Sequence, residues 1–237
     1  MKLTESGLRT GWCLLACLLA VITYFYGLDS QHIPKNGDEY PYEHITRLTA
    51  DSGKLLPLQS QLDNMRNTKP PLLFWQGIAS TGWGKNWTLW NLRYPSVIYT
   101  LLTAAMLFML GVKFTSKLET GFVAALTFLA FFTTYRFGRP FLTNPPEVFW
   151  IFLPFFVLLH WRQAFASRWL IPLVLGISIG IGFLYKSFAL GLPVALGLVA
   201  WYLHQRQYRI GEFLKQDALK VVTVSYTHLT LPTTPYV

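Results

Sequence analysis

Apolar residues occur along this chain in long blocks, and polar stretches separate the blocks. A block of about 20 apolar residues is long enough to cross the hydrocarbon core of a bilayer as a helix. The pattern therefore predicts an all-α polytopic membrane protein with about six transmembrane helices. The predicted helices are Trp12–Leu28, Leu92–Val112, Leu118–Thr134, Glu147–Trp161, Trp169–Tyr185 and Phe188–Leu203.

A long polar stretch, residues 29–91, separates the first two apolar blocks and holds most of the acidic residues. Within it, Tyr40, His44, Ile45 and Leu48 recur at nearly helical spacing. We therefore expect a long loop that carries short juxtamembrane helices near its ends.

Composition and charge agree with a membrane protein. The 237 residues are 52% hydrophobic and only 13% charged, whereas a soluble domain carries about 25% charged residues. The formal net charge is +9, but the cations lie between the apolar blocks and form no base-reading motif. They indicate membrane topology and contact with lipid headgroups, so nucleic acid is not an expected partner.

The distribution of Lys and Arg predicts the orientation, because cytoplasmic segments of membrane proteins are enriched in these residues. A cytoplasmic N-terminus makes the loop at residues 29–91 extracytoplasmic and leaves few cations in the short external segments. Those external cations are Arg136, Arg139 and Lys186, whereas the cytoplasmic segments hold Lys2, Arg9, Lys113, Lys117, Arg162, Arg168, Arg206, Arg209, Lys215 and Lys220.

The end of the chain, residues 224–237, differs in character from everything before it. It contains no charged residue, and its first ten residues, VSYTHLTLPT, resemble a translated sequencing adapter residue for residue. We predict that this tail is not a domain and that the natural reading frame is cut near Val222–Thr223. Residues 1–223 are then the N-terminal part of a transmembrane domain, and we expect them to be inactive alone.

Two adjacent carboxylates, Asp38 and Glu39, follow the first predicted helix. Near a membrane surface, such a carboxylate can accept a proton from an attacking hydroxyl. The pair is also suited to a divalent cation that neutralises a phosphate leaving group. The alternative is a solvated acidic turn in which Asp38 caps the N-terminus of a helix.

Four cations are candidate substrate-binding residues, and two of them, Lys69 and Arg93, could pair with a phosphate group. Lys69 precedes two prolines that stiffen the backbone, and Arg93 opens the second apolar block. Arg139 lies in a proline-rich segment, and Lys186 stands alone among apolar residues. Each has a simpler alternative: an interfacial anchor for Lys69 and Arg93, an external turn for Arg139, and a snorkelling side chain for Lys186.

The order of four short motifs along the chain carries a family resemblance. These motifs are Gly37-Asp38-Glu39, Lys69-Pro70-Pro71-Leu72, Arg93-Tyr94-Pro95-Ser96 and Gly182-Phe183-Leu184-Tyr185-Lys186. In this order the chain resembles the GT-C superfamily of glycosyltransferases, most closely family 39 and the aminoarabinose-transferase-like enzymes, kin to protein O-mannosyltransferases. The resemblance implies a multi-pass enzyme of the bacterial cytoplasmic (inner) membrane. Such an enzyme moves a sugar from a polyprenyl-phosphate carrier to a lipid, glycan or protein acceptor on the extracytoplasmic side.

The resemblance also implies roles for individual residues. Asp38 matches the catalytic acidic position and Glu39 its neighbour, whereas Lys69 matches the lysine near the carrier phosphate. Arg93, Arg139 and Lys186 are expected to bind substrate. The chain departs from the family at Asn144, where an aspartate is common, and an amide cannot act as a base. No metal or other cofactor is assigned, although a divalent cation would suit the acidic pair.

Two other classes of protein fit the same pattern. In a membrane transporter or lipid-binding protein without chemistry, Lys186 and the segment at residues 140–146 would line a pathway. Against this alternative, the sequence shows none of the repeated halves that many transporters have. In a purely structural subunit, Asp38 and Lys69 would tolerate alanine.

Overall fold

A computed structural model describes residues 5–31, 37–61, 69–161 and 170–186, together with residues 196–197, 200, 203–204, 211 and 215. Helices form all of the regular secondary structure in this described part of the chain. They are α1 (Glu5–Phe25), α2 (Glu39–Asp51), α3 (Leu72–Ser80), α4 (Leu89–Thr115), α5 (Leu118–Ala130), α6 (Phe132–Phe137), α7 (Asn144–His160) and α8 (Leu170–Tyr185).

The predicted helices correspond closely to observed ones. The first, second, fourth and fifth are α1, α4, α7 and α8, and two short helices, α2 and α3, occupy the polar stretch as expected. The third is shorter than predicted, because extended backbone at Phe131 (φ −61°, ψ 129°) separates α5 from α6. Most of the sixth, Phe188–Leu203, lies outside the described residues. Its span therefore stays a prediction, as does the total of six.

Two of the described helices are long and apolar enough to cross a membrane. They cover Gly7–Phe25 in α1 and Leu89–Thr115 in α4. The all-helical architecture and these two helices support the prediction of a membrane protein.

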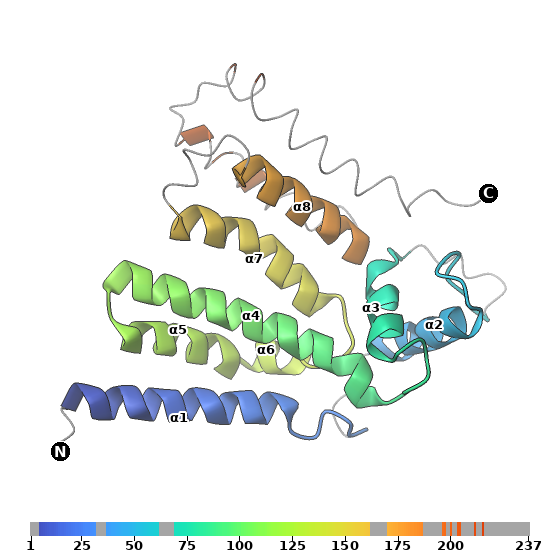
Figure 1. Cartoon of the computed structure of the whole chain (residues 1–237), viewed down its shortest axis with the longest axis horizontal. Coiled ribbons are helices and arrows are strands. Elements are labelled where there is room, and N and C mark those ends of the chain that lie inside the picture. The colour runs from blue at the N-terminus through green and yellow to red at the C-terminus, as the bar shows by residue number, and fades with distance from the viewer. Residues whose placement is uncertain are drawn as a thin grey trace.

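Five helices lie side by side in one row, in the order α1, α5, α4, α7 and α8 (Figure 1). Helices α2 and α3 pack against each other at one end of this row, and α3 also contacts α4 and α8. The ends of α1 and α8 and the starts of α4 and α7 lie at that same end (Figure 1). Residues far apart in the sequence therefore meet there.

The contact between α4 and α5 depends on two glycines, because small residues let two helix backbones approach closely. A Cβ atom added at Gly121 would lie 2.6 Å from the Val112 side chain and 2.7 Å from the Phe108 carbonyl oxygen. One added at Gly111 would lie 2.9 Å from the Gly121 Cα atom. There is no room for a methyl group at either position.

Replacing Gly121 with Ala is therefore expected to push α5 away from α4 and to lower the free energy of unfolding by about 1–3 kcal/mol. Thermal unfolding in detergent measures the change. Gly11→Ala is the matched control, since a Cβ atom at Gly11 in α1 meets nothing within 4 Å. An equal melting temperature for the two variants would contradict this account of the packing.

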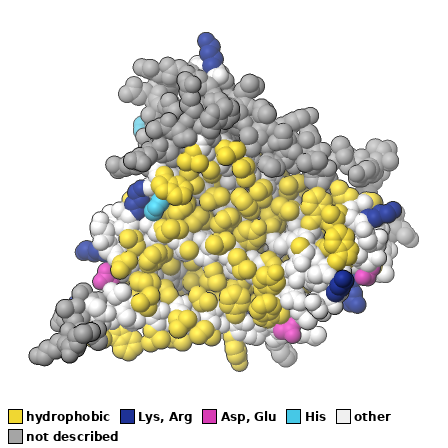
Figure 2. Space-filling model, in the orientation of Figure 1, with side chains coloured by type: hydrophobic (Ala, Val, Ile, Leu, Met, Phe, Trp, Pro, Cys, Tyr) yellow, Lys and Arg dark blue, Asp and Glu magenta, His cyan; other side chains and the backbone are white. Residues whose placement is uncertain are grey.

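Large apolar side chains cover much of the outside of the row. Hydrophobic residues fill the middle of the face in Figure 2, and Lys, Arg, Asp and Glu lie towards its margins. A soluble protein rarely exposes so large an apolar surface, whereas lipid covers it in a membrane. The exposed apolar residues on the row include Trp12, Leu14, Leu18, Leu19, Ile22, Ile98, Leu102, Met109 and Val123.

A buried cluster fixes the two short helices to the end of the row. Phe141 and Leu142, from the segment between α6 and α7, are 0% and 1% exposed. They pack with Tyr42 of α2, Phe74 of α3 and Tyr185 of α8. This core places the start of α2 beside the ends of the long helices.

Candidate functional site

Asp38 lies directly before α2, at the end of the row where the long helices meet. Its side chain is exposed and makes no hydrogen bond that caps the helix. Asp38 therefore occupies the N-cap position of α2, as in the alternative of a solvated acidic turn, but its side chain does not cap the helix. A carboxylate in this position stays available to a molecule outside the protein.

Tyr42, one helical turn after Asp38, is the centre of a small charged cluster. Its ring is 7% exposed and packs edge-on against Phe74, with 5.8 Å between the ring centroids. The Lys69 ammonium lies 5.9 Å from the centroid of the Tyr42 ring. Burial raises the pKa of Tyr42, as does the nearby charge of Asp38, whereas the charge of Lys186 lowers it. Asp38, Lys69 and Lys186 therefore all lie around one tyrosine.

Lys186 directly follows α8, and its ammonium nitrogen is 3.2 Å from a carboxylate oxygen of Glu147. Glu147 lies in the first turn of α7 and is 8% exposed. The Lys186 side chain is partly exposed, at 35%. The cation is thus held by a buried partner while part of it stays open to solvent or ligand.

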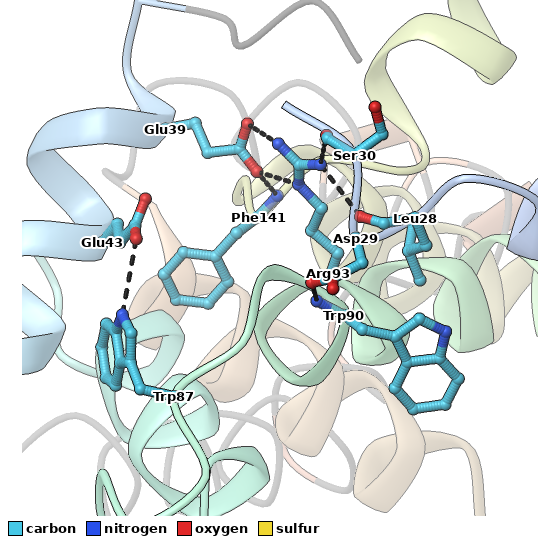
Figure 3. A network of polar contacts seen from close by, with 9 residues as sticks. All are labelled: Leu28, Asp29, Ser30, Glu39, Glu43, Trp87, Trp90, Arg93 and Phe141. Atoms are coloured by element: carbon cyan, nitrogen blue, oxygen red, sulfur yellow. Dashed lines mark hydrogen bonds and ion pairs between the residues drawn. The ribbon is translucent and has the colours of Figure 1, made fainter. Parts of the chain in front are cut away.

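A buried ion pair joins Glu39, the residue after Asp38, to Arg93 (Figure 3). The Arg93 side chain, in the first turns of α4, donates from Nε to Glu39 Oε1 at 2.7 Å and from Nη2 to Glu39 Oε2 at 3.0 Å. Arg93 and Glu39 are 0% and 1% exposed. Paired guanidinium–carboxylate bonds of this kind are short and geometrically specific.

The same pair also joins three further parts of the backbone (Figure 3). Arg93 Nη1 donates to the carbonyl oxygens of Leu28 and Ser30, both at 2.9 Å. The Phe141 amide donates to Glu39 Oε1 at 2.9 Å. The pair therefore ties the chain after α1 and the segment before α7 to the starts of α2 and α4.

Arg139 makes a second buried connection. Its Nε donates to the Tyr24 carbonyl oxygen at 3.0 Å, and its Nη2 donates to the Tyr26 carbonyl oxygen. Its Nη1 donates to the Tyr135 hydroxyl at 2.7 Å, and the guanidinium lies 4.6 Å from the Tyr135 ring centroid. Arg139 thus binds the end of α1 to the segment that leads into α7.

The structure divides the predicted site residues into two groups. Asp38 and Lys69 are exposed, Lys186 is partly exposed, and the charges of Asp38 and Lys186 act on Tyr42, which Lys69 contacts; Glu39, Arg93 and Arg139 are buried in contacts with the protein. Both Glu39 oxygens accept protein hydrogen bonds, whereas the Asp38 side chain is exposed. In the part of the chain that the structure describes, no group of three or more His, Cys, Asp or Glu residues could hold a metal ion.

Two residues at this place were not among those that the sequence predicts. Tyr42 lies four residues after Asp38, so a helix that starts at Asp38 would bring them onto one face. That spacing is a signal the sequence contains. Glu147 is a lone carboxylate at the edge of an apolar block, and nothing in the sequence indicates its partner.

Asn144 is exposed at the start of α7. It lines a cavity of about 210 Å³ together with Thr100 and Thr103 of α4, Thr134 of α6 and Phe137. The Thr100 hydroxyl is already used, since it donates to the carbonyl oxygens of Ser96 and Gly138.

Residues 36–234 match the family described as PMT, dolichyl-phosphate-mannose-protein mannosyltransferase. This range covers the polar stretch from residue 36 onward and every helix from α2 to α8. It also reaches into the tail that we predict to be foreign, which lies outside the described residues.

Curated relatives are bacterial enzymes with one shared activity in their names. The undecaprenyl phosphate-alpha-4-amino-4-deoxy-L-arabinose arabinosyl transferase 2 of Proteus mirabilis is 28% identical over 87% of this chain and 37% of its own length. The corresponding transferase of Pseudomonas savastanoi pv. phaseolicola is 28% identical over 92% of this chain and 40% of its own. The corresponding transferase of Pectobacterium carotovorum is 28% identical over 80% of this chain and 35% of its own length.

The chain therefore spans well under half the length of these relatives. No solved structure gives a significant match to it.

Proposed function

The chain belongs to the dolichyl-phosphate-mannose-protein mannosyltransferase (PMT) family, and on that premise we propose that the full-length protein is a membrane glycosyltransferase. It takes a sugar from a polyprenyl-phosphate carrier and transfers it to a lipid, glycan or protein acceptor. The names of the relatives support a carrier of the undecaprenyl phosphate type and a pentose such as 4-amino-4-deoxy-L-arabinose. The reaction takes place on the extracytoplasmic side of the bacterial inner membrane.

The observation that carries this proposal is the cluster of Asp38, Lys69 and Lys186 around Tyr42. A sugar transfer from a phosphate carrier needs a base for the acceptor and positive charge for the leaving phosphate. This cluster supplies an exposed carboxylate and two cations within reach of one aromatic ring. Because the carrier is dissolved in the membrane, its phosphate lies at the interface, where the row of apolar helices ends.

The positions of Lys and Arg residues along the row support an orientation of the protein in the membrane. Arg9 and Lys113 lie near the start of α1 and the end of α4, at the other end of the row from the cluster (Figure 1). A cytoplasmic location of that end follows the rule that Lys and Arg are enriched inside. Asp38 and its neighbours are then extracytoplasmic, and the protein is multi-pass with a cytoplasmic N-terminus.

The proposed chemical step is one displacement. The oxygen of an acceptor hydroxyl forms a bond to the anomeric carbon of the sugar, and Asp38 takes the hydroxyl proton. The bond between that carbon and the phosphate oxygen breaks, and its electron pair stays on the polyprenyl phosphate. Lys69 and Lys186 stabilise the charge that develops on the phosphate, because preorganised cations act most strongly where charge appears during the reaction.

We assign Glu39, Arg93 and Arg139 a different role from the direct contacts that the sequence predicts. They hold the backbone around Asp38 through buried hydrogen bonds. Glu39 fixes the first turn of α2, and Asp38 precedes that turn directly. These three residues therefore position the base without contacting the sugar.

The test uses the full-length gene product reconstituted in vesicles with a radiolabelled undecaprenyl phosphate-linked aminoarabinose. The expected result is a labelled acceptor together with an equal amount of free undecaprenyl phosphate. Movement of labelled carrier across the membrane without covalent transfer would favour the transporter alternative and overturn the proposal.

A further inference from the structure

The ion pair between Glu147 and Lys186 has no role in the transfer step described so far. We propose that Glu147 is a positioning residue that aims the Lys186 ammonium at the phosphate of the sugar donor. This inference rests on the proposed function, which it deepens by giving a role to a residue that the sequence leaves without one.

Glu147 is held rigidly. Two prolines, Pro145 and Pro146, open the first turn of α7, and the Glu147 amide donates to the Thr143 carbonyl oxygen at 3.0 Å. The carboxylate is 8% exposed and lies near a helix N-terminus, where the helix dipole favours negative charge. Its position is thus fixed by the fold and does not depend on a ligand.

The backbone at Lys186 is equally well fixed. Tyr185, the last residue of α8, is 3% exposed, and its hydroxyl lies 2.7 Å from Gln76 Oε1 and 3.1 Å from the Tyr99 hydroxyl. The Lys186 amide continues the helix with a bond to the Gly182 carbonyl oxygen at 3.0 Å. Only the flexible side chain of Lys186 is left to orient, and Glu147 at 3.2 Å orients it.

The direction of the pair matters for the chemistry. The charge of Lys186 acts on Tyr42, whose ring lies beneath Lys69 and one helical turn from Asp38. When the sugar–phosphate bond breaks, the carrier phosphate changes from a singly charged diester to a doubly charged monoester. A cation aimed at the phosphate oxygen that leaves the sugar therefore stabilises the transition state more than it stabilises the bound donor. Such a cation raises kcat more than it lowers KM.

A double-mutant cycle on full-length protein tests the inference. We expect Glu147→Gln to lower kcat about 10–100-fold, the cost of a misplaced group, with little change in the KM for the donor. Lys186→Met should lower kcat by at least as much, about 10²–10³-fold. The double variant should be no slower than Lys186→Met, because Glu147 acts only through Lys186. Glu147→Asp, which keeps the charge, should restore part of the rate.

A matched control is Glu119→Gln, at the start of α5 and at the opposite end of the helical row (Figure 1). It should leave kcat and KM unchanged. Two results would overturn the inference. One is that the losses in kcat multiply in the double variant. The other is that Glu147→Gln lowers the melting temperature as well as the rate and Glu147→Asp restores neither, which would show that Glu147 is merely structural.

Chemical labelling separates this inference from the proposed function. Acylation of Lys186 by an amine-reactive reagent, followed by mass spectrometry, should be several-fold faster in Glu147→Gln, because the ammonium loses the partner that shields it. If Lys186 is labelled faster in Glu147→Gln but the wild type transfers no sugar, the pairing of Glu147 with Lys186 stands and the proposed glycosyltransferase function is refuted. Transfer by the wild type with unchanged labelling would refute the pairing alone.

Discussion

Asp38→Asn is expected to lower the rate of sugar transfer by about 10²–10⁴-fold, the usual contribution of a general base. Asparagine keeps the shape of the side chain but cannot take the proton of the acceptor hydroxyl. Asp38 is exposed and makes no capping hydrogen bond, so its replacement removes no contact that holds α2 in place. The variant should therefore insert into the membrane and unfold at the temperature of the wild type. Transfer from a labelled polyprenyl-phosphate sugar in vesicles gives the rate.

The control for this substitution lies on the same helix. Asp51 is the last residue of α2, is exposed and lies at the opposite end of that helix from Asp38. Asp51→Asn makes the same change of charge and should leave transfer unaltered. A rate for Asp38→Asn within a few-fold of that of Asp51→Asn would remove Asp38 from the reaction.

Arg93→Met is expected to have the largest effect on stability, a loss of about 3–5 kcal/mol in the free energy of unfolding. The substitution leaves the Glu39 carboxylate buried without its counter-ion and frees the carbonyl oxygens of Leu28 and Ser30. A buried charge without a partner costs far more than an exposed one. The expected observation is a lower melting temperature in detergent together with a lower yield of membrane-inserted protein.

Two further variants make this prediction sharper. Arg136→Met makes the same substitution at an exposed position. In the described part of the chain, the contacts of the Arg136 guanidinium are with the rings of Phe132 and Phe137. Arg136→Met should therefore leave the free energy of unfolding nearly unchanged. Arg93→Met combined with Glu39→Leu should recover part of the loss, because no unpaired charge is then buried. A melting temperature of Arg93→Met equal to that of Arg136→Met would contradict the structural role of the pair.

The helices could be predicted because lipid-facing blocks of apolar residues are long and continuous. The end of the third predicted helix could not, since no proline, glycine or charged residue marks the break at Phe131. Short helices in the polar stretch were also predictable, because Ile45 and its neighbours repeat at helical spacing.

The candidate site was predictable in part. Lys186 stands out in the sequence because a charge among apolar residues is rare and costly. Asp38 stands out because it adjoins a second carboxylate, and Lys69 because two prolines follow it. Burial does not show in the sequence, so Arg93 and Arg139 have the same signature as the accessible cations. Both arginines bind carbonyl oxygens, which every residue possesses, and the carboxylate that pairs with Arg93 is 54 residues away in the sequence. The pairing of Glu147 with Lys186 likewise depends on how α7 packs against α8.

The connections made by Glu39 and Arg139 have a consequence for the biogenesis of the protein. The Phe141 amide is 102 residues from Glu39, and Arg139 is 115 residues from Tyr24, whose carbonyl oxygen it binds. In the proposed orientation, a ribosome that has just delivered the polar stretch to the extracytoplasmic side has not yet made either partner. At synthesis rates of about 5–20 residues per second, the stretch waits several seconds before the segment before α7 emerges and locks it. During that interval the start of α2 lacks its final anchor, so a translocation-associated chaperone or protease would meet this loop before the base is set in place.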